Sequence, residues 1–203
     1  MEREYERHTL TDFINIVQSP GTTKFSKIKQ IKHRVYSPAT DYYKSLREKI
    51  IDVISESEDI KQINLAVAAA HANRREHYAA IASNMISWYA KQKNLSWLEP
   101  PRGYYKPNSI GIKVNPEIGF QDSDGKVSII KLHMNKEALS KGKLEVAAYL
   151  FYTTLAPQCP PNTTFAFLDL HQGKLFPVKK LHDSGSIFLA AEIAYIEQIW
   201  GSA

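Results

Sequence analysis

Residues 109–134, SIGIKVNPEIGFQDSDGKVSIIKLHM, contain two apolar segments that are joined by a polar turn. Apolar residues occupy alternate positions of 110–114, which is typical of a half-buried strand. The turn at 121–125, QDSDG, contains an Asp-Gly pair that favours a hairpin. Residues 127–134 are again apolar and predict the returning strand. We therefore expect a β-hairpin at the centre of the fold.

The segments after the hairpin predict a helix, two strands and a last helix. Apolar residues recur at helical spacing over 139–155, until a proline-rich stretch ends the pattern. The run FAFLDL at 165–170 is nearly all apolar and predicts a buried strand, followed by a strand at 174–176. A helical pattern over 186–200 closes the chain.

The first half of the chain reads as helices. Helical spacing predicts them at 9–17 and 22–36, then from a Ser-Pro start at 37–38 to residue 55. Two more patterns cover 59–70 and the stretch up to residue 89, and the pattern leaves open whether residues 71–73 break them.

This order predicts an α/β protein of the α+β type, in which a small mixed sheet is flanked by helices. A composition change near Glu99 separates a helical region, 1–98, from a sheet-containing core, 99–203. We expect the two regions to share one globular domain.

Composition excludes several classes of protein. The chain of 203 residues is 43% hydrophobic and 11% aromatic, which is more than disordered proteins contain. It lacks the run of about 18 apolar residues that a membrane span needs. The charged start, MEREYER, is unlike a secretory signal, and a single cysteine, Cys159, fits a reducing compartment. We expect a cytoplasmic protein without membrane contact.

Basic residues are concentrated near the N-terminus. The net charge is +5, and residues 22–36 contain no acid while apolar residues recur at intervals of three and four. A cationic helix face of this kind attracts a phosphate backbone, but short runs of charge are more often a solvated surface. Arg residues beside His71 on a later predicted helix allow the same two interpretations. The candidate nucleic-acid contacts are Lys24, Lys27, Lys29, Lys32, Arg34, Arg74 and Arg75.

A carboxylate and a lysine fall on the two strands of the predicted hairpin region. Glu117 follows Pro116 at the end of the first strand, and Lys131 lies in the middle of the returning strand. On neighbouring strands these side chains can face the same side, hold a divalent cation and orient water against a phosphodiester. The alternative is structural: Glu117 ends a strand, and Lys131 extends from a buried strand to solvent.

At these residues the chain resembles the PD-(D/E)xK nuclease superfamily, and within it the RecB-like branch, over about residues 70–176. Pro116-Glu117 stands where that family has Pro-Asp, and Lys131 where it has its lysine. Glu145 and Tyr149 have the spacing of the RecB-like Gln-x-x-x-Tyr motif, and Glu76 can take the place of a helical carboxylate. The resemblance implies a restriction-endonuclease-like fold, bound Mg²⁺ and catalysis by the following residues: Glu117, Lys131, Glu145 and Tyr149.

The chain departs from the family pattern at Ile129, where the resemblance calls for a second metal-binding acid. Asp122, Asp124 and Glu137 are nearby acids, and we take Glu117 with Asp124 as the candidate metal ligands. We therefore expect a nucleic-acid-associated protein that binds DNA or RNA without efficient cleavage. A Mg²⁺-dependent nuclease with an irregular site and a subunit that binds proteins, including a second copy of itself, remain the alternatives.

Asp169 is a further candidate functional residue, because its expected position is buried. Asp169 ends the apolar strand at 165–170, and a carboxylate there needs a partner or a role.

Overall fold

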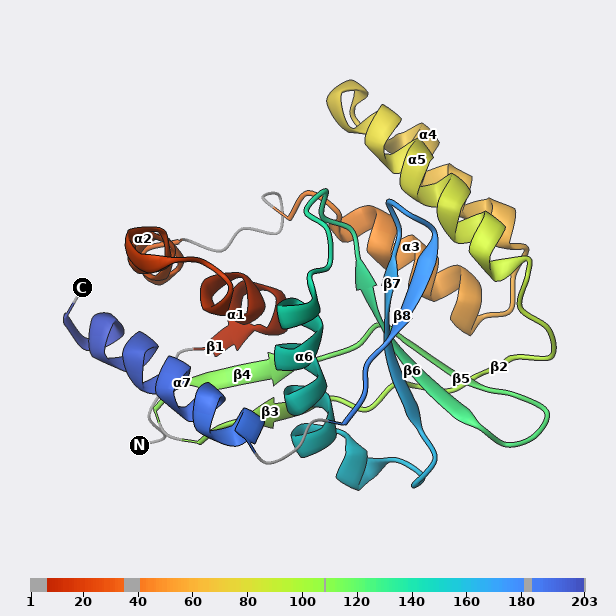
Figure 1. The fold of residues 1–203 in the computed structure, drawn as a ribbon. Helices are drawn as coiled ribbons and strands as arrows, with labels where there is room; N and C mark the ends of the chain where they lie inside the picture. The colour runs from red at the N-terminus through yellow and green to blue at the C-terminus, as the bar shows by residue number, and fades with distance from the viewer. Residues whose placement is uncertain (1–6, 35–40, 108, 181–183, 203) are drawn as a thin grey trace, which may run out of the picture.

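β6 is the central strand of a five-stranded sheet (Figure 1). The computed structural model describes residues 7–34, 41–107, 109–180 and 184–202. The strand pairs β2–β5, β5–β6 and β7–β8 are antiparallel, and β6–β7 is parallel. In order across the sheet, the strands are β2 (Ser96–Trp97), β5 (Ile118–Gln121), β6 (Val127–His133), β7 (Thr164–Asp169) and β8 (Lys174–Pro177).

A second sheet of three strands adjoins the first. Its middle strand, β4, pairs parallel with β1 and antiparallel with β3, and it leads into β5 through residues 115–117. The hairpin partner of β6 is therefore β5. Our expectation that residues 110–114 supply this partner was wrong, because the chain changes sheets at Pro116. The strands are β1 (Arg7–Thr9), β4 (Gly111–Val114) and β3 (Gly103–Tyr105).

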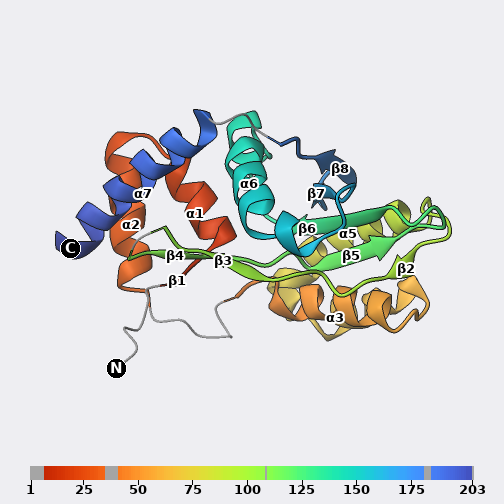
Figure 2. The same ribbon diagram turned by 90° about the horizontal axis from the view of Figure 1, so that it is seen from below.

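Helices from the first half of the chain cover one face of the five-stranded sheet (Figure 2). Alternate strand residues such as Ile130 and Leu168 point into this layer, where they meet buried side chains of α3 and α5. The elements of this layer are α3 (Lys44–Ser55), the 3-10 helix η2 (Ile60–Ile63), α4 (Asn64–Ala69) and α5 (Ala72–Tyr89). The break between α4 and α5 falls at Ala70 and His71, which both have extended backbone.

The opposite layer combines both ends of the chain. α6 connects β6 to the parallel strand β7, α1 and α7 pack beside it, and α2 packs against α1 and α7 (Figures 1 and 2). Buried residues of α1, α6 and α7 form one hydrophobic cluster with the other faces of β6 and β7. The helices are α1 (Leu10–Val17), α2 (Gly21–Lys32), α6 (Lys141–Thr154), the 3-10 helix η3 (Ala156–Gln158) and α7 (Ser184–Ser202).

The mixed α/β architecture expected from the sequence is confirmed. Both hydrophobic clusters join helices of the first half to strands of the second. The helical patterns at 9–17, 139–155 and 186–200 correspond to α1, α6 and α7 within a few residues. The predicted start at 37–38 lies outside the described residues. Within the described ranges, no helix has the length and apolar character to cross a membrane.

Candidate functional site

Glu117 and Lys131 face each other at the junction of the two sheets. Ile118 pairs with Ile130 in the antiparallel β5–β6 ladder, so the preceding Glu117 lies opposite Lys131. Side chains alternate between the faces of a strand, and Ile130 points to the α3–α5 layer. The Glu117–Lys131 pair therefore lies on the α6 side of the sheet.

The two side chains form a buried ion pair. Lys131 Nζ donates a hydrogen bond to Glu117 Oε1 and another, of 3.1 Å, to the carbonyl oxygen of Asn115. The backbone N–H of Leu132 donates to Glu117 Oε2 at 2.8 Å. Glu117 and Lys131 are only 9% and 8% exposed. Both carboxylate oxygens are thus occupied by donors of the chain itself.

A second ion pair lies close to the first. Arg47 of α3 donates to Asp41 Oδ2 at 2.7 Å. Burial alone would lower the pKa of the Arg47 guanidinium, but the hydrogen bond to Asp41 raises it, with a further contribution from the charge of Glu117. The positive charge of Arg47 therefore adds to that of Lys131 around the Glu117 carboxylate.

The residues around Glu117 do not fit a divalent cation, which needs several oxygen ligands. Ile129, at the position of the expected second acid, is 0% exposed and belongs to the α6-side cluster. Asp124 lies in the β5–β6 turn, and the four residues of β5 separate that turn from Glu117, about 13 Å along the strand. Glu137 is paired with Lys143 Nζ at 2.9 Å. Among the described residues, no group of three His, Cys, Asp or Glu could hold a metal ion.

The other residues named by the resemblance lie elsewhere. Glu145 forms an exposed pair with Lys141 one turn earlier in α6, at 3.7 Å. The Tyr149 ring packs edge-on against Tyr105 of β3, and burial, together with their hydrogen bond, raises the pKa of Tyr105 to about 12. Glu76 is exposed on α5, in the opposite layer. The structure does not bring these three residues together with Glu117.

Contacts within the chain occupy several cations of the basic segment. Lys24 Nζ forms a half-buried ion pair with Glu192 of α7, at 2.7 Å. Lys32 Nζ donates to the carbonyl oxygen of Trp200, near the end of the same helix, at 2.5 Å. These two lysines attach α2 to α7, a structural role that is independent of a ligand.

The remaining cations of this segment are more accessible. Arg34 pairs with Asp12 at 2.7 Å, and almost half of its side chain is exposed. Lys27 is half-buried. Lys29 is exposed, and its Nζ lies 4.8 Å from the centre of the Phe25 ring. Lys29 and Arg34 are therefore the exposed candidate contacts in the described part of this segment.

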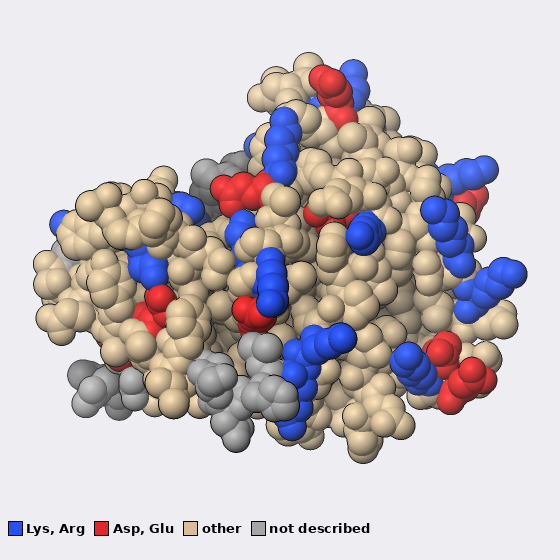
Figure 3. All heavy atoms as spheres, viewed as in Figure 1, with Lys and Arg blue, Asp and Glu red and all other residues tan. Residues whose placement is uncertain are grey.

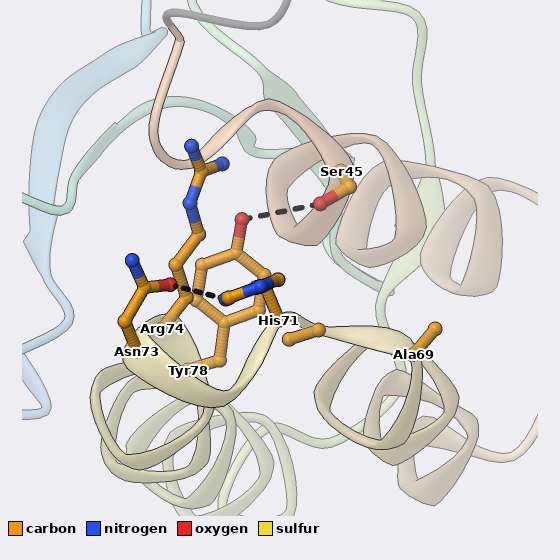
Figure 4. A pocket seen from close by; sticks show the side chains of 7 residues that line it. Ser45, Ala69, His71, Asn73, Arg74 and Tyr78 are labelled. Carbon is orange, nitrogen blue, oxygen red and sulfur yellow. Dashed lines mark hydrogen bonds between the residues drawn. The ribbon is translucent and has the colours of Figure 1, made fainter.

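Arg74 lies beside a cavity of about 400 Å³ between α3, α4 and α5 (Figure 4). Arg74 Nη1 donates to the carbonyl oxygen of Tyr42 at 3.2 Å, and its guanidinium lies over the Tyr42 ring. Arg75 donates to the carbonyl oxygen of Ala70. Arg74 thus bonds to the backbone just before α3, and Arg75 bonds to the backbone at the α4–α5 break. The cavity is lined by Ser45, Ala69, Ala70, His71, Asn73, Arg74 and Tyr78.

A polar cluster that the sequence analysis did not assemble lies where the parallel strands β6 and β7 end. His133, Asp169 and Lys174 occupy one row across β6, β7 and β8. His133 Nε2 contacts the carbonyl oxygen of Glu137 at 2.6 Å, and His171 Nε2 contacts that of Met134 at 2.8 Å. The two imidazoles therefore hold the loop between β6 and α6. The two histidines are brought together only by the parallel pairing of β6 with β7. The spacing of residues along the chain does not reveal that pairing.

Asp169 closes the turn between β7 and β8. Its Oδ1 accepts the backbone N–H groups of His171 and Gln172, at 2.9 and 3.1 Å, and its Oδ2 accepts Gln172 Nε2. The residue is 2% exposed. The sequence predicted that this buried carboxylate has a partner or a role. Its partners are the hydrogen-bond donors of the β7–β8 turn.

Replacing Asp169 by alanine will lower the free energy of unfolding by about 2 kcal/mol, because the β7–β8 turn loses the buried carboxylate that accepts three of its hydrogen bonds. Asp122 provides a matched control: its Oδ1 accepts two backbone N–H groups in the β5–β6 turn, where Asp124 and Lys126 are exposed. Asp122→Ala should lower the free energy of unfolding by less, because water can replace the Asp122 carboxylate as the acceptor in this exposed turn. Urea unfolding of both variants measures the difference, and equal losses would contradict a buried role for Asp169.

Comparison with known proteins identifies no family. No family model matches the chain, and no curated protein is significantly similar to it.

Proposed function

We propose that the protein binds nucleic acid on a restriction-endonuclease-like scaffold and does not cleave it efficiently. The environment of the Glu117 carboxylate supports the absence of efficient cleavage. This carboxylate is neutralised by Lys131 and has donors on both oxygens, and the neighbouring position for a second acid is the buried Ile129. Metal-assisted attack on a phosphodiester needs an accessible acid pair, which this arrangement lacks.

The strand order supports the scaffold. A hairpin, β5–β6, is followed by the crossover helix α6 and the parallel strand β7, which is the order that the resemblance to the PD-(D/E)xK superfamily implies. The Glu and Lys of the resemblance face each other on that hairpin. A similar fold alone does not establish function, so nucleic-acid binding has to be supported by the residues of a particular surface.

Accessible lysines at one end of the five-stranded sheet support binding of a polyanion. Lys136, in the β6–α6 loop, and Lys174, at the start of β8, are exposed and follow or belong to the two strands that flank β7. The acids nearest to them are engaged: Asp169 closes the β7–β8 turn, and Glu137 pairs with Lys143. On the face of the molecule in Figure 3, Lys and Arg side chains are distributed singly, with Asp and Glu between several of them.

An aromatic ring accompanies these lysines. Lys174 Nζ lies 5.1 Å from the centre of the half-buried Phe176 ring. Lysines beside aromatic rings suit a single strand, whose phosphates meet the cations while its bases stack. We therefore assign the principal contact to the ends of β6, β7 and β8.

Binding is tested by fluorescence anisotropy with labelled single- and double-stranded DNA and RNA over a salt series without metal. We expect affinity to fall as salt rises, because Lys contacts release counterions from the phosphates. Lys174→Glu should weaken binding and reduce the steepness of the salt dependence by about one unit on a log-log plot.

Two matched variants locate the contact. Lys61→Glu changes the net charge equally at an exposed position in the opposite layer, and it should leave affinity nearly unchanged. Lys29→Glu tests the basic segment of α2. If Lys29→Glu weakens binding more than Lys174→Glu does, the assignment to the sheet end is wrong. Absence of binding at low salt would overturn the proposed function.

A further inference from the structure

The cavity of about 400 Å³ between α3, α4 and α5 belongs to the helical layer opposite α6 (Figure 4). It lies at the break between α4 and α5, where the backbone of Ala70 and His71 is extended. Short side chains leave it open on the α4 side, which is lined by Ala69 and Ala70. Cavities of several hundred Å³ are typical sites for small organic molecules.

Two hydroxyl groups of the cavity are oriented by hydrogen bonds. Tyr78 is 1% exposed, and its hydroxyl donates to the carbonyl oxygen of Tyr42 at 2.6 Å. The Tyr78 oxygen also lies 3.1 Å from Ser45 Oγ. Because a phenol has only one proton, the Ser45 hydroxyl has to be the donor in this second bond. Ser45 Oγ therefore acts as an acceptor toward a molecule in the cavity.

Asn73 and Arg74 provide donors on the α5 side of the cavity. The amide oxygen of Asn73 lies 3.0 Å from His71 Nδ1, and this oxygen can only accept, so the imidazole donates. The donor group of Asn73 is its amide NH₂. The Arg74 guanidinium bonds to the Tyr42 carbonyl and lies 4.8 Å from the centre of the Tyr42 ring. These contacts hold a positive charge at the wall of the cavity.

The charges around the cavity favour an anion. None of the described residues that line it is acidic, and Arg74 is cationic. Asp41, which precedes Tyr42 in the chain, is paired with Arg47 at 2.7 Å. Arginine suits phosphate in particular, because its planar guanidinium can donate two parallel hydrogen bonds.

We propose that this cavity binds a small organic phosphate, with the phosphate group against Asn73 and Arg74 and a hydroxyl group of the organic part donating to Ser45. In Figure 4, Ser45 lies on the opposite side of Tyr78 from Asn73. Donors on one side and an acceptor on the other suit a molecule with an anionic end and a hydroxyl-bearing end, as in a sugar phosphate. The terminal nucleotide of a nucleic-acid strand presents the same chemistry. The cavity shares no residue with the contact assigned to the ends of β6, β7 and β8.

Isothermal titration calorimetry of the full chain with ribose 5-phosphate tests this proposal. We expect ribose 5-phosphate to bind about tenfold or more tightly than ribose, which lacks the phosphate. Asn73→Asp keeps the acceptor for His71 but places a carboxylate against the phosphate, so it should weaken binding about tenfold or more. Asn94→Asp makes the same change at an exposed position between α5 and β2 and should leave affinity unchanged. Circular dichroism confirms that both variants are folded.

A short single strand with either a 5′-phosphate or a 5′-hydroxyl distinguishes the two sources of the phosphate. If the cavity takes the end of a strand, the 5′-phosphate should tighten binding, and Asn73→Asp should remove the difference. If it takes a free sugar phosphate, the end group has no effect while ribose 5-phosphate still binds. The proposal is overturned if ribose 5-phosphate does not bind at millimolar concentration, or if it binds the wild type and a folded Asn73→Asp variant equally.

Discussion

Lys131→Met will lower the free energy of unfolding by about 3–5 kcal/mol, which is the usual cost of leaving one charge of a buried pair without its partner. The substitution keeps the long apolar stem of the side chain but removes the ammonium group that bonds Glu117 and the Asn115 carbonyl. Glu117 then remains 9% exposed with only the Leu132 N–H as a donor. Urea unfolding monitored by circular dichroism measures the loss.

A double variant separates the charge from the packing. Glu117→Gln retains an acceptor for the Leu132 N–H, and Glu117→Gln/Lys131→Met removes both charges together. We expect the double variant to be more stable than Lys131→Met alone, because no unpaired charge stays buried. Lys141→Met removes a lysine from the exposed pair with Glu145 and should cost less than about 0.5 kcal/mol. If the two single losses simply add in the double variant, the ion pair does not exist in solution.

Acidification from neutral pH to about pH 4 will destabilise the protein by about 3 kcal/mol through His8 alone. His8 is 1% exposed on β1, and neither ring nitrogen has a hydrogen-bond partner within the described part of the chain. Burial lowers its pKa from 6.5 to about 4; Asp12 opposes this shift, and Arg34 adds to it. The neutral imidazole instead packs edge-on against Trp200, with ring centres 4.5 Å apart.

The direction of this pH dependence follows from proton binding. Between about pH 6.5 and pH 4, His8 is protonated in the unfolded chain and neutral in the folded one, so the unfolded state binds more protons. Stability is therefore complete above about pH 6.5 and falls as the pH is lowered. His8→Phe should remove this part of the pH dependence, and His71→Phe, at an exposed site, should not. The difference between wild type and His8→Phe isolates His8, since all other titrating groups are common to both. A difference that stays constant with pH would contradict a buried neutral His8.

Periodicity along the chain was sufficient to predict most helices and the strands β6 and β7. The apolar alternation of 110–114 was correctly interpreted as a strand, but its partner was not, because a local pattern contains no information about which sheet a strand joins. The short strands β1, β2 and β3 have two or three residues each, too few for a period to be recognised. They depend on tertiary pairing with β4 and β5.

The candidate site was predictable only in part. Glu117 and Lys131 do face each other, because pairing in a hairpin follows from its turn. The partners that occupy Lys24 and Lys32 lie 168 residues away along the chain, so the sequence alone could not distinguish these internal contacts from a nucleic-acid surface. The cluster of His133, Asp169 and His171 depends in the same way on the parallel crossover through α6.

A cleavage assay under conditions of saturated binding tests most directly whether this protein holds nucleic acid without cutting it. End-labelled DNA and RNA would be incubated with the full chain at low salt, with Mg²⁺ and separately with Mn²⁺, and resolved on a denaturing gel. We predict a retained complex whose nucleic acid remains intact with either metal. Metal-dependent fragments that form with the wild type, and that disappear with a folded Glu117→Gln variant, would contradict the account.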